Sequence, residues 1–168
     1  MSRIRTLKGE IIFAVAALLC AVGPAWAQNP HFIRVTSSLE ADGDLDVTFK
    51  EAGLGDTATN YVASASATAT CTCVTHSGRC PSAANKVTFS EQVSAAGTFS
   101  PHNGTVSATL VIAAPACPSS APPTCGGGQE LRLSEISYTN IQITDTTHGV
   151  GPQPATPSSL SATFFTCP

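Results

Sequence analysis

Residues 61–80, YVASASATATCTCVTHSGRC, carry a two-residue alternation that determines the expected fold. One set of alternate positions is mostly small and apolar and the other mostly hydroxylic: Tyr61, Ala63, Ala65, Ala67, Ala69, Cys71 and Cys73 against Ser64, Ser66, Thr68, Thr70 and Thr72. Only a strand separates these sets, because successive side chains of a strand point to opposite faces. We therefore expect a strand over 61–74, with a bulge or bend because strands are typically about 5–6 residues long.

The inner face of this long strand consists mainly of methyl groups, so bulky side chains have to cover it. We expect the opposing sheet to supply them from Phe49, Phe89, Phe99 and Phe164. Cys71 and Cys73 share the inner face while Thr72 points away, so each sulfur can reach a different neighbour.

Turn signals divide the remaining chain into further strands. We expect them over 32–39, 45–50, 87–99, 105–112, 130–146 and 160–167, with hairpin turns at Asp42-Gly43 and Asn103-Gly104. The apolar residues of 130–146 change parity twice: they occupy odd-numbered positions, then even-numbered ones, then odd-numbered ones again. This pattern predicts two bulges or a strand break. Seven or eight strands with Ser and Thr facing water favour an all-β fold, a two-sheet antiparallel sandwich of immunoglobulin-like layout.

Residues 1–27 have the pattern of a signal peptide. Basic residues precede an apolar run over 11–22, and Ala25-Trp26-Ala27 suits signal peptidase. The run is shorter than the about 20 residues of a membrane-spanning helix. We expect cleavage after Ala27, one domain over 28–168, and a secreted protein, extracellular or periplasmic, without a membrane anchor. A lipoprotein anchored at Cys20 is the alternative, which the bulky Leu19 before it disfavours.

Charge excludes one class of partner. The chain has 8 basic and 11 acidic residues, a formal net charge of −3, and no Lys/Arg run that could neutralise phosphates. We therefore expect no nucleic-acid partner. Six cysteines remain after the leader, and an even number in an exported chain predicts disulfides: Cys71, Cys73, Cys80, Cys117, Cys125 and Cys167.

Several short motifs resemble a group of small exported bacterial proteins of unknown function. They are FKEAGLG at 49–55, Cys73 followed by Gly78, Pro81 and Asn85-Lys86, then Gly128-Gln129, Tyr138-Thr-Asn140 and Asp145-Thr-Thr147. The resemblance spans most of the domain and implies a Cys73–Cys125 disulfide, but it implies no activity. Cys80–Cys117 is expected beside that disulfide, and Cys71–Cys167 would tie the last strand to the long one. Short loop closure favours an alternative, Cys73–Cys80 with Cys117–Cys125.

The sequence holds no recognisable catalytic or cofactor motif. Four histidines fall in or beside expected loops, far apart: His31, His76, His102 and His148. No spacing selects a glycosidase-like pair from the carboxylates Glu91, Glu130, Glu135 and Asp145. Asp42, Asp44 and Asp46 offer oxygens for calcium, but an EF-hand loop needs Gly and Glu where Val47 and Gly53 stand. We expect a solvated turn there, no metal, no cofactor and no enzymatic activity.

A rigid sandwich with loops rich in Gly, Pro and Ser is typical of a protein that presents loops. We therefore expect a non-catalytic secreted binding or surface module, whose partner is an extracellular protein or a glycan. Carbohydrate is the less favoured ligand, because sugar platforms use exposed aromatic rings and the core needs most of those in the chain. Tyr61 and Tyr138 are the aromatic residues that a sugar platform would use.

Serine-protease inhibition is an alternative function. Residues 117–125, CPSSAPPTC, are similar in length and in their Ser-x-Pro-Pro-x-Cys half to the reactive loop of Bowman–Birk inhibitors. That resemblance implies a Cys117–Cys125 ring holding Pro118, Ser119 and Ser120 extended, with Ser119 in the specificity pocket and a reduced ordering cost on binding. Pro118 departs from the usual threonine. An unrecognised secreted hydrolase is a second alternative.

Overall fold

A computed structural model of the protein describes residues 29–81, 85–118 and 124–167. The expected signal peptide and its cleavage site lie outside these ranges. The described residues contain no helix, and therefore none long and apolar enough to cross a membrane. They form eight strands: β1 (His31–Leu39), β2 (Leu45–Ala52), β3 (Thr59–Thr75), β4 (Lys86–Phe99), β5 (Thr105–Ile112), β6 (Gln129–Asp145), β7 (Val150–Pro154) and β8 (Leu160–Thr163).

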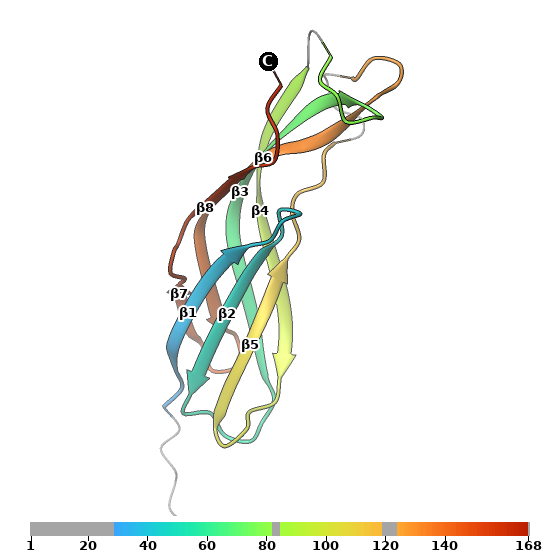
Figure 1. Ribbon diagram of the computed structural model, residues 1–168. Helices are drawn as coiled ribbons and strands as arrows, with labels where there is room; N and C mark the ends of the chain where they lie inside the picture. Colours follow the sequence, from blue (N-terminus) through green and yellow to red (C-terminus); the bar gives the residue numbers. More distant parts are fainter. Residues whose placement is uncertain (1–28, 82–84, 119–123, 168) are drawn as a thin grey trace, which may run out of the picture.

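Two antiparallel sheets pack face to face, which confirms the expected all-β sandwich (Figure 1). One sheet has three strands in the order β1-β2-β5. The other has five, in the order β4-β3-β6-β7 with β8 also paired to β6. The long strands of the second sheet continue beyond the end of the first, so the molecule is elongated (Figure 1).

The alanine face of β3 lies at the centre of the core. Ala63 and Ala69 are fully buried, as are Cys71 and Cys73. The three-stranded sheet covers the alanines with Leu45, Val47, Phe49, Leu110 and Ile112. The expected source of bulk is therefore confirmed for Phe49, whereas Phe89 and Phe99 belong to β4 in the same sheet as β3.

The predicted changes of parity in 130–146 are two bulges within one continuous strand. The β3–β6 register shifts between Ser64 and Ser66 and again between Thr70 and Cys71, each time with one extra residue on β6. Of the bulge or bend expected in the long strand, no bulge forms in its pairing with β4, which has no register shift. Instead, β3 follows the curvature of the sheet (Figure 1).

The predicted hairpin around Asp42-Gly43 is present and joins β1 to β2. The turn at Asn103-Gly104 is also present, but the hairpin predicted around it is wrong, because β4 and β5 belong to different sheets and do not pair. Gly43 has a φ of 99° within the connection over 40–44, and Asn103 and Gly104 have φ of 51° and 69°, the positive values that tight turns use. A side chain at Gly104 would collide with the Leu54 carbonyl oxygen, 2.8 Å from the Cβ position. The last strand is shorter than expected and ends at Thr163. β7 lies in the stretch between the expected strands 130–146 and 160–167, where the sequence predicts no strand.

The disulfides are Cys71–Cys117, Cys73–Cys125 and Cys80–Cys167. The pairing implied by the resemblance, Cys73–Cys125, is confirmed. The expected Cys71–Cys167 and Cys80–Cys117 pairs are wrong. The alternative, Cys73–Cys80 with Cys117–Cys125, is also wrong. Three disulfides indicate an oxidising, extracellular-type environment.

The correct pairing follows from where the two sheets end. β5 stops at Ile112, so the next segment crosses the uncovered end of β3 and brings Cys117 to Cys71. β8 pairs β6 rather than β3, and the chain after it runs past the sheet end to Cys80. Lys86 Nζ donates a hydrogen bond of 3.4 Å to the Cys167 carbonyl, which holds the same tail.

Candidate functional site

The central part of the outer face of the five-stranded sheet carries an array of uncharged polar side chains. In β3 the outward residues from Ser64 to Thr70 are all hydroxylic, and the cross-strand register places polar residues on both sides of them. The uncharged neighbours are Thr88, Ser90, Gln92 and Ser94 on β4 and Ser137, Thr139 and Gln142 on β6. Among the described residues, the charged side chains of this face lie toward the disulfide end: Lys86, Glu130, Arg132 and Glu135.

Hydrogen bonds between neighbouring strands fix these side chains. Thr68 Oγ1 lies 2.8 Å from Ser90 Oγ, and Thr70 Oγ1 lies 2.9 Å from Thr88 Oγ1. Gln92 Nε2 donates to Ser66 Oγ at 2.8 Å. A hydroxyl group has one donor and two acceptor sites, so each keeps hydrogen-bonding capacity for a ligand after one such bond. The result is a pre-ordered, neutral surface of donors and acceptors.

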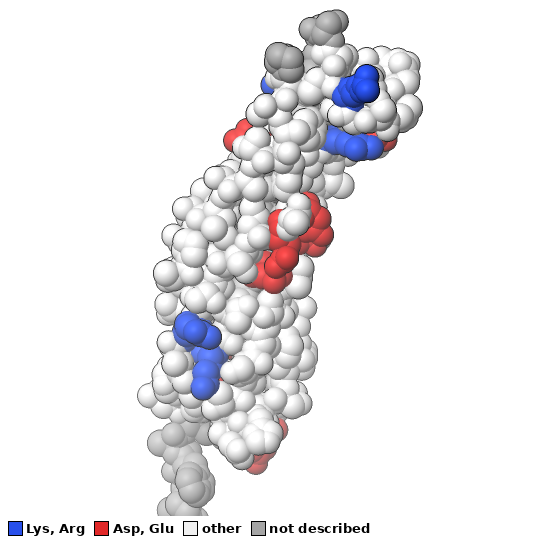
Figure 2. Space-filling view, in the orientation of Figure 1, with Lys and Arg blue, Asp and Glu red and all other residues white. Residues whose placement is uncertain are grey.

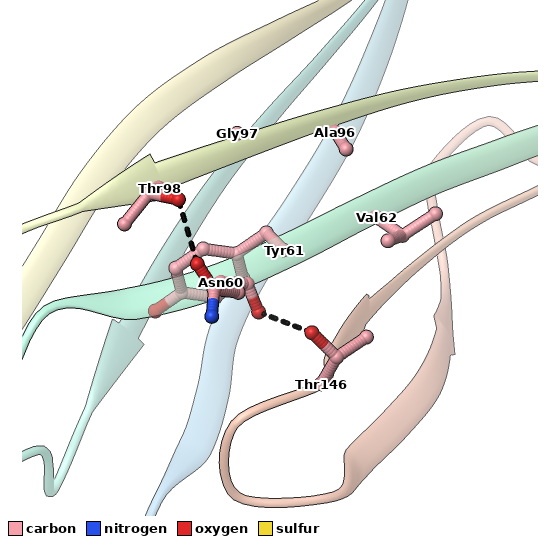
Figure 3. Close-up of a pocket in the computed structure, with 7 residues that line it drawn as sticks. All are labelled: Asn60, Tyr61, Val62, Ala96, Gly97, Thr98 and Thr146. Carbon is pink, nitrogen blue, oxygen red and sulfur yellow. Dashed lines mark hydrogen bonds between the residues drawn. The ribbon is translucent and has the colours of Figure 1, made fainter.

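A depression of about 430 Å³ lies at the end of this face remote from the disulfides. Its lining combines polar groups with a floor of small apolar residues: Asn60, Tyr61, Val62, Ala96, Gly97, Thr98 and Thr146. Thr98 Oγ1 donates to Asn60 Oδ1 at 2.6 Å, and Thr146 Oγ1 donates to the Asn60 carbonyl at 3.1 Å (Figure 3). Because Thr98 occupies Oδ1, the Asn60 Nδ2 hydrogens are the donors that the side chain can offer a ligand.

The turn after β6 also holds the Asn60 backbone in place. The Asn60 backbone N–H donates to Thr147 Oγ1 at 2.9 Å, and its carbonyl also accepts the Thr146 N–H at 2.9 Å. The depression is therefore built from β3, β4 and the turn after β6. No charged residue lines it.

Buried acidic groups lie on the core side of the same end. The Glu51 and Asp145 side chains are both fully buried. Asp145 has partners, because Oδ1 accepts the Thr147 N–H at 2.8 Å and the His148 N–H at 3.0 Å, and Oδ2 lies 2.7 Å from His148 Nδ1. This contact within one turn satisfies the buried carboxylate and fixes the turn that carries Thr146.

Glu51 has no such partner. Neither of its carboxylate oxygens, nor the Tyr61 hydroxyl, makes a hydrogen bond with any described residue. Burial raises the pKa of the Glu51 carboxyl above its ordinary value; the neighbouring Tyr61 hydroxyl lowers it and the nearby Asp145 raises it, and burial has the largest effect. Burial, together with the neighbouring Glu51, also raises the pKa of the Tyr61 hydroxyl. Both shifts show that a negative charge on Glu51 or Tyr61 is unfavourable at this buried site.

The candidate residues from the sequence are mostly not brought together. Among the described residues, no group of three or more His, Cys, Asp or Glu side chains could hold a metal ion. Of the four histidines, His148 contacts Asp145, and His76 Nδ1 lies 3.7 Å from Glu130 at the disulfide end. Arg132 forms an ion pair with that same Glu130 carboxylate.

The acidic turn is used structurally, as expected for a solvated turn. Asp42 Oδ1 accepts the Asp44 N–H at 3.1 Å, and Asp44 Oδ1 accepts the Ala114 N–H at 2.8 Å. Tyr61 and Tyr138 are fully buried, so neither can serve as a sugar platform.

The Cys117–Cys125 ring of the inhibitor hypothesis is absent, because each cysteine bonds to β3 instead. Ser119 and Ser120 lie outside the described residues, and Pro118 is partly exposed. Sequence reasoning identified the hydroxyl face of β3 but missed the Asn60 depression. The signal was the small Ala96-Gly97 pair flanked by Thr98, whose alignment with Asn60 depends on the β3–β4 register.

Comparison with known proteins adds no further assignment: no protein family, curated protein or solved structure matches the chain.

Proposed function

We propose that the protein is a secreted, non-catalytic binding module that holds a neutral, hydroxyl-bearing ligand, such as a glycan chain, on the outer face of its five-stranded sheet. The observation that carries the proposal is the uncharged array of hydroxyl and amide groups that runs along β3, β4 and β6 to the Asn60 depression. A ligand without charge avoids the desolvation cost of an unpaired ion at such a surface.

Binding on this face relies on hydrogen bonds rather than on ring stacking. The aromatic rings of Phe49, Tyr61 and Phe99 pack against one another in the core, with centroids 4.5 to 6.0 Å apart. The strand spacing of about 4.8 Å and the side-chain repeat of about 7 Å along a strand give a regular grid of hydroxyls. Such a grid suits an extended, repeating ligand better than a small one.

The test is a screen of neutral and charged oligosaccharides, followed by calorimetry with the best neutral ligand. Asn60→Ala removes the side-chain amide and leaves the backbone bonds of Asn60 to Thr146 and Thr147 intact. We expect it to weaken binding by about tenfold, the effect of losing one or two neutral hydrogen bonds. Gln153→Ala removes an exposed amide on β7 outside the depression, and it should bind like the unmodified protein.

Binding that is confined to charged ligands would contradict the proposal. So would equal affinity of the Asn60→Ala variant and the unmodified protein for the neutral ligand. Turnover of any oligosaccharide in the same samples would refute the non-catalytic part of the proposal.

A further inference from the structure

The opposite face of the molecule, formed by the three-stranded sheet, has two patches of opposite charge (Figure 2). The basic patch consists of Arg34 and Lys50, which are cross-strand partners on β1 and β2. The acidic patch consists of Glu40, Asp42, Asp44 and Asp46, in and beside the β1–β2 turn. Among the described residues, neither Arg34 nor Lys50 forms an ion pair.

An exposed apolar side chain accompanies each patch. Ile33, the extra residue of the β1 bulge, is 55% exposed and precedes Arg34. Val111 is 53% exposed and lies opposite Asp46 on β5. These two are the exposed large hydrophobic residues of the described chain. Val111 and the acidic residues line a depression of about 320 Å³.

Uncharged threonines separate the two patches. Thr48 lies between Asp46 and Lys50 on the outer row of β2, and its neighbours in register are Thr36 and Thr109. Asp46 and Lys50 are four residues apart, or about 14 Å along the strand. A two-fold axis through the threonines would therefore place each basic patch over the acidic patch of a second copy.

We infer that this face is a self-complementary docking surface for a second copy of the same chain, arranged with its strands antiparallel. Both patches lie on one face, so two copies related by a two-fold axis can pack these faces together. The contact between a basic patch and an acidic patch then forms twice in the dimer. The Lys50 side chain of each copy enters the acidic depression of the other. Charge complementarity favours this partner over an unrelated one.

The size of the face predicts a weak dimer. Three strands of about eight residues cover roughly 27 by 14 Å, about half of the 800 Å² that each partner buries in a typical stable interface. Electrostatic attraction between exposed charges weakens as salt shortens the screening length. We expect a rapid monomer–dimer equilibrium that is visible at high protein concentration and low salt.

Sedimentation velocity with two charge-reversed variants tests the inference. Arg34→Glu/Lys50→Glu places like charges in contact, and Glu40→Lys/Asp46→Lys cancels the net charge of the acidic patch and places Lys beside Lys50, so each variant alone should associate at least about tenfold more weakly than the unmodified protein. An equimolar mixture of the two variants restores opposite charges in both contacts of the dimer. The mixture should therefore associate about as well as the unmodified protein.

A matched control separates this effect from net charge. Glu91→Lys/Glu135→Lys changes the net charge as much as Glu40→Lys/Asp46→Lys does, but on the other sheet, and should leave association unchanged. A monomeric unmodified protein at low salt and high concentration would overturn the inference. Failure of the mixed variants to associate would also overturn it, and would show that an observed dimer uses another surface.

Discussion

Replacing Glu51 by glutamine is expected to stabilise the protein at neutral pH. Glu51 is fully buried on the core side of β2, and its carboxylate oxygens have no hydrogen-bond partner among the described residues. Glutamine has nearly the same shape and cannot become charged. Glutamine still places a polar group at this site, so the gain comes only from removing the charge, which costs more to bury than a neutral polar group; we expect it to be on the order of 1–3 kcal/mol at neutral pH.

The pH dependence distinguishes this cause from simple repacking. The pKa of Glu51 is raised in the folded protein, so the folded state binds the proton more tightly than the unfolded state does. The contribution of Glu51 to stability is therefore fully present below the unfolded pKa of about 4.3 and is lost as the pH rises through the folded pKa. The advantage of Glu51→Gln should be small at pH 4 and should grow toward pH 7.

Urea denaturation at several pH values, with the disulfides intact, measures this difference. Glu135→Gln provides the control, because Glu135 is an exposed carboxylate on the outer sheet face. A Glu51→Gln variant that is less stable than the unmodified protein at pH 7 would refute the reasoning, because it would show that the carboxylate has a stabilising partner. A difference that does not change with pH would refute the role of its titration.

Three further changes test the packing of the fold. Replacing Cys80 and Cys167 by alanine opens a loop with a sequence separation of 87, and the chain-entropy model predicts a loss of about 4–5 kcal/mol, visible as a lower Tm. Burial raises the pKa of the Tyr138 hydroxyl to about 12, so ionisation of this residue should lower the free energy of unfolding of the unmodified protein between about pH 10 and 12. Urea denaturation over this pH range should show a smaller decrease in the free energy of unfolding for Tyr138→Phe. Gly104→Ala forces a side chain against the Leu54 carbonyl at a positive φ, and chemical denaturation should show a loss of about 1–3 kcal/mol, whereas an unchanged midpoint would contradict the turn geometry.

The strand pattern could be predicted from the sequence where one face is buried. Alternation identified β3, and the two changes of parity in β6 located its bulges within a few residues. β7 could not be predicted, because VGPQP holds two prolines and a glycine, which usually indicate a loop. An edge strand tolerates proline, since one side of it needs no ladder hydrogen bonds.

The disulfide pairing and the Asn60 depression depend on how distant strands are arranged in space. A local sequence pattern does not specify that arrangement. Cys117 reaches Cys71 because β5 ends early and leaves the end of β3 uncovered. Asn60, Thr98 and Thr146 meet because two independent registers align β4 and the turn after β6 with the same residue of β3. Hydrophobic periodicity specifies which face a residue occupies, but not which distant strand lies beside it.

Backbone chemical-shift mapping with a neutral oligosaccharide tests the proposed binding face most directly. We predict that the largest shifts fall on Asn60, Thr98 and Thr146 and continue along the hydroxyl residues of β3. The amides of β1 and β5, on the other sheet, should serve as the unperturbed reference. Shifts that concentrate on the three-stranded sheet or around Cys80, with none at Asn60, would contradict a ligand site on the outer face of the five-stranded sheet.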